Sequence, residues 1–156
     1  MAEITAIFLA AGAGQPMHQV ASAQLESGKG IVGDRYHAGL GAFSRKLAAS
    51  GKDDWQITLI ESEEIENFLA SAQLPFGPGD FRRNVITSGI RLNPLVGRIF
   101  VLDGVRLQGV RLCEPCSYLA KLLGKKVVPA MAGRCGLRAR ILDDGMVRSG
   151  GPIEAQ

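Results

Sequence analysis

The sequence is poor in aromatic residues and has no long apolar run, and these shortages exclude several classes of protein. Aromatic side chains make up 6% of the residues, and no basic stretch is interleaved with them, so we expect no nucleic-acid partner bound by base stacking. No window holds the roughly 18 consecutive apolar residues of a membrane-spanning helix. The N-terminal stretch lacks the basic flank of a signal peptide, so we expect a cytoplasmic protein with no membrane partner.

Cysteine is also scarce, and its number bears on the redox compartment. Three cysteines are an odd number for a chain of this size, which argues against a disulfide scaffold and for free thiols in a reducing compartment. With 156 residues, 46% of them hydrophobic, the chain suits one folded unit with one core. We therefore predict a single domain that spans residues 1–156.

Charged residues are unevenly distributed along the chain. Residues 1–81 carry 5 Lys/Arg and 10 Asp/Glu, whereas residues 82–156 carry 13 Lys/Arg and 5 Asp/Glu. Ten of the 12 arginines lie in that second part. Because a guanidinium forms paired hydrogen bonds with phosphate or carboxylate, this bias indicates an anionic small-molecule ligand. A solvated basic face without a ligand is the alternative.

Short apolar segments, separated by scattered glycines and prolines, predict many short strands joined by turns. Strands are expected at residues 4–9, 19–26, 56–60, 85–87, 98–102, 105–110, 137–142 and 146–148. The turn residues at 103–104 (DG) and 143–145 (DDG) each predict a β-hairpin. Helices are expected at residues 61–72 and 116–123, whereas residues 38–54 look irregular. The pattern favours a mainly β (α+β) fold, a closed or nearly closed β-barrel with two or more short helices.

The strongest chemical signal is the segment 113–116 (CEPC). Cys113 and Cys116 could form half of a zinc site, but a structural zinc site needs four ligands. A thioredoxin-like pair needs a βαβ context, which a position after a hairpin and late in the chain does not provide. Cys116 alone begins a predicted helix, where free N–H groups favour a thiolate that could act as nucleophile, sulfur carrier or metal ligand. Its helical spacing with Leu119 and Leu123 leaves a second interpretation open, a buried core residue.

Polar residues on three other segments are candidates for binding an anionic cofactor beside Cys116. They offer guanidinium forks, an amide, a carboxylate and an imidazole, which suit a phosphate or a planar heterocycle. The candidates are Arg82, Arg83, Asn84, Asp34, Arg35, His37 and Arg111. For each segment the alternative is an ordinary turn or a solvated basic pair.

Four segments, in this order, resemble the MOSC domain family, named after the C-terminal domain of molybdenum cofactor sulfurases. They are residues 30–37 (GIVGDRYH), 56–60 (QITLI), 81–85 (FRRNV) and 112–116 (LCEPC). The resemblance spans roughly residues 4 to 150. It implies a barrel like that of pyruvate kinase and a functional cysteine in the Pro-Cys pair, which is Cys116 here.

The resemblance implies two kinds of function. As in the sulfurases, where a separate pyridoxal-phosphate domain mobilises cysteine sulfur, the domain would bind molybdenum cofactor (molybdopterin) or carry sulfur, with a cysteine desulfurase as partner. As in the mitochondrial amidoxime-reducing component, Cys116 would ligate molybdenum, and N-hydroxylated compounds would be reduced with electrons from a donor protein. Arg83 stands where the amidoxime-reducing relatives have proline, and Tyr36 where many relatives have histidine. A non-catalytic binding module with a silent cysteine is the remaining alternative.

Overall fold

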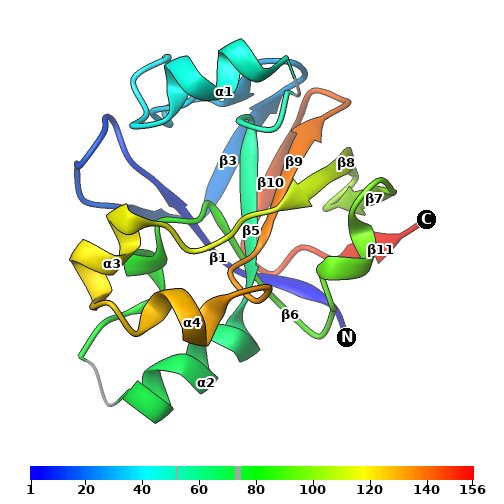
Figure 1. Cartoon of the computed structure of the whole chain (residues 1–156). Coiled ribbons are helices and arrows are strands. Elements are labelled where there is room, and N and C mark those ends of the chain that lie inside the picture. Colours follow the sequence, from blue (N-terminus) through cyan, green and yellow to red (C-terminus); the bar gives the residue numbers. More distant parts are fainter. Residues whose placement is uncertain (52, 73–74) are drawn as a thin grey trace.

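Eight short strands form one curled sheet, and most neighbouring strands in it run antiparallel (Figure 1). The computed structural model describes residues 1–51, 53–72 and 75–156. The eight strands are β1 (Glu3–Leu9), β2 (His18–Val20), β5 (Ile57–Glu61), β6 (Val85–Ser88), β7 (Ile99–Leu102), β8 (Val105–Leu112), β9 (Leu137–Ile141) and β11 (Ile153–Ala155). Across the sheet their order is β11-β7-β8-β9-β5-β6-β1-β2. β5 and β6 pair in parallel, which places the segments before them side by side.

A smaller antiparallel sheet covers the inner face of the curled sheet. It consists of β3 (Ser22–Glu26), β4 (Gly30–Ile31) and β10 (Gly145–Arg148), in the order β10-β3-β4. Its apolar residues Leu25 and Val147 share one buried core with Leu59, Phe100 and Leu137 of the large sheet. Alternating apolar residues on β3 and β9 therefore contribute to this first core, as expected for strands with one buried face. β5 is buried on both faces, and its Ile57 and Leu59 face the first core.

The mainly β fold with short helices is confirmed, whereas the predicted closed or nearly closed barrel is confirmed only in part, because the large sheet is a curled half-barrel that does not close. β10 pairs with β3, so the predicted hairpin at residues 143–145 is wrong. The two carboxylates of this loop bind distant parts of the chain: Asp143 accepts a hydrogen bond of 2.9 Å from Nε of Arg106, and Asp144 accepts one of 2.7 Å from the Ser27 N–H. After this loop the chain leaves β9 and joins the small sheet.

The predicted hairpin at residues 103–104 is confirmed. β7 and β8 pair antiparallel with Leu102 opposite Val105, so the loop has only two residues. Asp103 and Gly104 have φ angles of 46° and 83°. Both values lie in the left-handed region that a two-residue turn of this kind requires.

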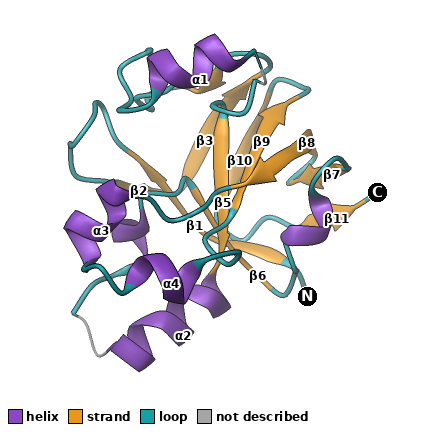
Figure 2. Ribbon diagram, viewed as in Figure 1, coloured by secondary structure: helices purple, strands orange, loops and turns teal. Residues whose placement is uncertain are grey.

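The α-helices of the described residues lie against the outer side of the large sheet or at its end (Figure 2). They are α1 (Ser44–Ser50), α2 (Ser62–Ala72), α3 (Ser117–Leu123) and α4 (Val127–Met131). α2 and α3 confirm the two predicted helices, whereas α1 lies in the segment predicted to be irregular and α4 was not predicted. Ile65 and Phe68 of α2 pack with Leu119 of α3, Val127 of α4 and Ile60 of β5 in a second buried core. No helix in the described part of the chain is long and apolar enough to cross a membrane.

Candidate functional site

A row of polar side chains crosses the middle of the large sheet on the side that faces the helices. Thr58 of β5 lies opposite Arg138 of β9, which in turn lies opposite Arg111 of β8. Their chain neighbours Leu59 and Leu137 belong to the first core, so alternation along the strands turns the row to the other face. Polar residues in the middle of a sheet face are unusual where helices cover that face, which makes this row a candidate site.

Cys116 lines a cleft that also includes Thr58 and Arg138 of this row. We call it the arginine cleft. The cleft and the open solvent in front of it together hold about 450 Å³ of empty space. Its walls come from β5, β9, the segments before α1 and β6, and the start of α3. The residues that give it its chemical character are Arg35, Arg82, Arg83, Arg138, Tyr36, Tyr118 and Cys116. Four guanidiniums and a thiol therefore face one space.

A second cleft, which we call the side cleft, adjoins the first. This cleft and the open solvent in front of it together hold about 640 Å³ of empty space. It shares Phe43, Arg83, Cys116 and Arg138 with the arginine cleft, and adds Lys46, Leu47, Arg111, Glu114 and Pro115. Cys116 thus stands between two basic clefts, with α1 contributing to the side cleft alone.

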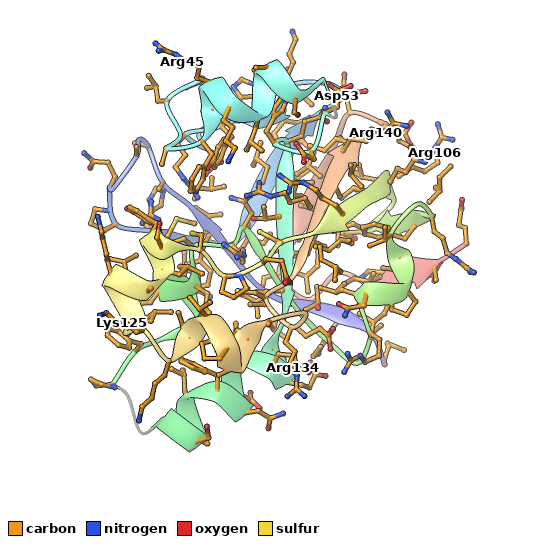
Figure 3. The ribbon with its side chains drawn as sticks, viewed as in Figure 1. Arg45, Asp53, Arg106, Lys125, Arg134 and Arg140 are labelled. Atoms are coloured by element: carbon orange, nitrogen blue, oxygen red, sulfur yellow. The ribbon has the colours of Figure 1, made fainter. Side chains whose placement is uncertain are left out.

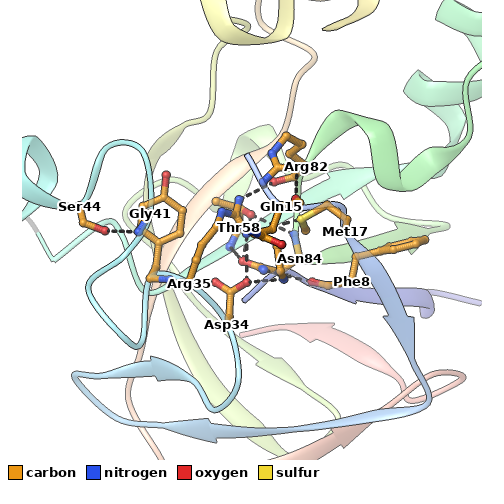
Figure 4. Close-up of polar contacts among 12 residues, drawn as sticks. Phe8, Gln15, Met17, Asp34, Arg35, Gly41, Ser44, Thr58, Arg82 and Asn84 are labelled. Atoms are coloured by element: carbon orange, nitrogen blue, oxygen red, sulfur yellow. Dashed lines mark hydrogen bonds and ion pairs between the residues drawn. The ribbon is translucent and has the colours of Figure 1, made fainter. Parts of the chain in front are cut away.

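A buried carboxylate orients Arg35 in the arginine cleft (Figure 4). Nη1 of Arg35 lies 3.0 Å from Oδ1 of Asp34, and Nη2 donates to the main-chain oxygen of Arg82 at 3.2 Å. Asp34 also accepts hydrogen bonds from the N–H groups of Ala10 and Tyr36. Asp34 itself does not line the cleft, so its role here is to hold Arg35.

Arg82 is held at the mouth of the same cleft by the main chain and by an aromatic ring. Its φ of 60° is in the left-handed region, its Nη1 donates to the main-chain oxygen of Gln15 at 2.8 Å, and its guanidinium lies 5.5 Å from the ring centre of Tyr118. Burial and repulsion by Arg35 lower the pKa of Arg82. A bound anion would relieve that repulsion.

Arg83 is a buried cation that ties the cysteine segments to the sheet. Its Nε donates to the main-chain oxygen of Cys135 at 2.9 Å, its Nη1 to that of Phe81 at 3.3 Å, and its Nη2 lies 3.2 Å from Sγ of Cys135. Within the described residues it has no carboxylate partner. Burial lowers the pKa of Arg83, but its interactions with the thiols of Cys113, Cys135 and Cys116 raise it by more, so the net shift is upward. This side chain places a fixed positive charge beside Cys116.

The three thiols lie in different surroundings. Cys113 and Cys135 are each 1% exposed and belong to the interior, whereas Cys116 is half-buried and packs on the rim of the second core. Burial raises the pKa of Cys135 to about 11, against the opposing effect of Arg83. Cys116 is the N-cap residue of α3 and its side chain makes no capping bond. α3 has only seven residues, so the arginines, more than a helix dipole, supply the positive field at Cys116.

The structure brings four of the predicted site residues together in the arginine cleft: Cys116, Arg35, Arg82 and Arg83. Arg111 lies on the side cleft, paired with the buried Asp54. Asn84 is buried beneath Thr58, whose N–H and hydroxyl both donate to its Oδ1. His37 lies on a separate hollow, with Nε2 2.5 Å from Oε1 of Glu26. Tyr36, and not His37, reaches the arginine cleft.

Several residues of the two clefts were missed from the sequence, above all Arg138, Lys46 and Tyr118. The alternation of segment 137–141 (LRARI) indicates that Arg138 and Arg140 face away from the core. Nothing local indicates that Arg138 lies opposite Arg111, because this pairing joins distant strands. Lys46 was not predicted because it lies within residues 38–54, which were expected to be irregular.

Two further observations limit what the site can be. Among the described residues, no three His, Cys, Asp or Glu side chains are close enough to hold a metal ion together, so a protein-only zinc site has no support there. Arg45 of α1 projects outward, as do Lys125 and Arg134 in the turns before and after α4 (Figure 3). These charges are solvated and do not add to the clefts.

Comparison with known proteins identifies the family. The MOSC domain profile matches residues 46–154, and a search of curated proteins found no match. Among solved structures, the YuaD protein from Bacillus subtilis is 21% identical with a TM-score of 0.76, over 99% of this chain and 96% of that one. YiiM from Geobacillus stearothermophilus is 18% identical with a TM-score of 0.71, over 100% of this chain and 75% of that one.

A third structure agrees with these two. YiiM from Escherichia coli is 17% identical with a TM-score of 0.66, over 99% of this chain and 69% of that one. At such identities the structural likenesses show the fold alone. The family profile, however, covers more than half of the residues, and the chain therefore belongs to the MOSC domain family.

Proposed function

We propose that this protein binds molybdenum cofactor or carries sulfur at Cys116. The observation that carries the proposal is the half-buried Cys116 on the wall of a cleft with four guanidiniums. Family membership associates the domain with molybdenum cofactor. If Cys116 were a silent cysteine, the four arginines that line the cleft with it would have no explained function.

The residues of the arginine cleft suit the chemistry of such a cofactor. A thiolate is a soft ligand of the kind that a soft metal prefers, and guanidinium forks match phosphate oxygens. Arg138 makes no side-chain hydrogen bond or ion pair within the described part of the chain, and Arg82 uses only Nη1 internally. Both side chains therefore have donors free for anions, Arg82 in the arginine cleft and Arg138 at the border between the two clefts. When bound, the cofactor would supply two-electron redox chemistry.

The remaining cleft residues would position and shield the reacting thiol. Arg83 fixes the main chain around Cys113 and Glu114 through Nη2, so it holds the loop that carries Cys116. Tyr36 and Tyr118 stand against Arg35 and Arg82 with ring centres 4.8 and 5.5 Å from the guanidinium carbons. Such stacked pairs form rigid walls for a planar ligand.

As a sulfur carrier, Cys116 would take part in a balanced exchange with a protein persulfide. The Cys116 thiolate attacks the outer sulfur of the donor's persulfide, the donor's S–S bond breaks, and the donor cysteine leaves as a thiolate. A cysteine desulfurase is the class of partner that supplies such a persulfide. The charge of Arg83 and Arg138 stabilises the persulfide anion that forms on Cys116.

A second candidate function, reduction of N-hydroxylated compounds with an external electron donor, is favoured by one observation. The side cleft opens beside Cys116 but does not contain Arg35 or Arg82. It would leave room for a substrate beside the thiol while the arginine cleft holds the cofactor. Turnover of an N-hydroxylated base with a chemical reductant would distinguish this activity from a carrier role.

The proposal is tested by molybdenum and pterin analysis of protein purified from a host that makes the cofactor. We expect both to co-purify with the wild type and with Cys113→Ser, and to be lost from Cys116→Ser. For the carrier role, incubation with a desulfurase and cysteine should add the mass of one sulfur atom to Cys116. Absence of molybdenum, pterin and added sulfur from the folded wild type would contradict the proposal.

A further inference from the structure

Two arginines face each other across neighbouring strands in the side cleft. Arg111 of β8 and Arg138 of β9 are direct partners in the ladder, so their Cα atoms are about 5 Å apart. Like charges directly opposite each other destabilise a sheet. Such a pair is expected where an anion bridges the two side chains for at least part of the protein's working cycle.

The hydrogen-bond and ion-pair partners within the described residues do not neutralise the charges of Arg111 and Arg138. Arg111 is paired with Asp54, which is fully buried behind it, and its side chain is still 47% exposed. One carboxylate oxygen of Asp54 has no hydrogen-bond partner, so Asp54 engages Arg111 through a single oxygen. Arg138 has no ion-pair or side-chain hydrogen-bond partner within the described residues.

The rest of the side cleft adds positive charge and an apolar wall. Lys46 of α1 and the buried Arg83 also line it. Its one acidic lining residue, Glu114, accepts a hydrogen bond of 2.8 Å from the Gly133 N–H through Oε1. Apolar side chains complete the lining: Phe43, Leu47 and Pro115. The cleft therefore offers an anion site together with a surface for carbon atoms, next to the Cys116 sulfur.

We infer that the side cleft binds the carboxylate of a small organic substrate, held between Arg111 and Arg138, with its reacting part toward Cys116. The inference rests on the proposed role of Cys116 as the reacting centre. A carboxylate matches the planar fork of each guanidinium, and the apolar wall fits the carbon skeleton attached to it. Lys46 brings a third charge from α1, so α1 packs against the bound molecule.

Two alkylating reagents that differ only in charge test this inference. Iodoacetate carries a carboxylate and iodoacetamide a neutral amide, while the reacting carbon and the iodide leaving group are the same. We measure both rate constants at Cys116 by mass spectrometry, on the full chain from a host that makes no molybdenum cofactor. The ratio of the iodoacetate to the iodoacetamide rate should exceed that of glutathione about tenfold, because a basic cleft concentrates the anion.

Matched variants assign the preference to the side cleft. Arg138→Gln and Lys46→Gln should each reduce the ratio several-fold toward the value for glutathione, whereas Arg138→Lys should retain most of it. Arg106→Gln removes the same charge from an exposed site at the other end of β8 (Figure 3), and it should leave the ratio unchanged. A ratio equal to that of glutathione in the wild type, or a Cys116 that neither reagent labels, would overturn the inference.

Protection by added anions identifies the class of ligand. Propionate should slow labelling of Cys116 by both reagents, and propionamide should not. Protection by inorganic phosphate without protection by propionate would overturn the carboxylate assignment. These rates need neither molybdenum nor a sulfur donor. A protein that shows the charge preference but retains no cofactor and accepts no sulfur would thus contradict the proposed function while supporting the anion site.

Discussion

Leu137 and Arg138 are neighbours on β9, yet they belong to two regions that are built on opposite principles. Leu137 belongs to the first core of buried apolar side chains. Arg138 faces the clefts, where its cross-strand neighbour is another arginine. The first region lowers the free energy of the folded state by burying apolar area. The opposed charges of Arg111 and Arg138 in the second region raise it instead, which indicates that these two residues serve binding and not stability.

The largest loss of stability is expected from a substitution in the first core. Leu137 is fully buried, so Leu137→Ala removes buried methyl groups and leaves a cavity. We expect a loss of about 3 kcal/mol in the free energy of unfolding, measured by urea denaturation. A loss below about 1 kcal/mol would show that the first core does not control stability.

A similarly large loss in the free energy of unfolding is expected for Arg83, a cleft arginine with a structural role. Arg83→Met should cost about 2 to 3 kcal/mol, since it removes the donors that satisfy the buried main-chain oxygens of Cys135 and Phe81. The exposed Arg106 serves as the control, and Arg106→Met should change stability by less than about 1 kcal/mol. Equal effects of the two variants would refute the structural role of Arg83.

The buried thiol of Cys135 should make stability depend on alkaline pH. Its pKa of about 11 in the folded state lies above the ordinary value of 9.0, so folding favours the protonated thiol. This contribution is fully present below pH 9 and is lost as the pH rises through 11, by about 2 kcal/mol. The difference in unfolding free energy between wild type and Cys135→Ala, followed from pH 8 to 11, should shrink by that amount. A constant difference would mean that Cys135 titrates normally.

The smallest effect on stability should come from Arg138 itself. Arg138→Gln removes one of two opposed charges, so we expect the unfolding free energy to stay within about 0.5 kcal/mol of the wild type or to rise slightly. Urea titrations at low salt would measure it, with Leu137→Ala as the contrasting neighbour. A loss as large as that of Leu137→Ala would contradict the view that Arg138 is kept for binding.

Local patterns in the sequence predicted most elements but not their long-range partners. Alternation and the Asp103-Gly104 turn indicated the strands and the β7–β8 hairpin, because these signals act between close neighbours in the chain. The same reasoning failed for residues 143–145, because the strand after this loop pairs with β3, which is remote in sequence. A barrel was therefore predicted where the chain forms a half-barrel and a separate small sheet.

The candidate site could likewise be predicted only in part: the chemically suited residues were identified, but not how distant strands bring them together. Arg82, Arg83 and Cys116 were identified as chemically suited residues, and the structure shows them on one cleft. Arg138 could be expected to face away from the core, but its position opposite Arg111 depends on the pairing of β8 with β9. His37 has the right chemistry, but the loop turns it toward Glu26 and Tyr36 toward the cleft.

The most direct test of the account compares the three thiols of the folded protein. The central claim is that Cys116 is the reacting thiol, in reach of solvent and surrounded by arginines, while Cys113 and Cys135 are structural. Native protein from a host without the cofactor is treated with limiting iodoacetamide between pH 6 and pH 9, and each cysteine is quantified by mass spectrometry. We predict that Cys116 is labelled first at every pH, and that Cys113 and Cys135 are labelled only after unfolding. Labelling of Cys135 before Cys116, or a Cys116 that stays unlabelled until the protein unfolds, would contradict the account.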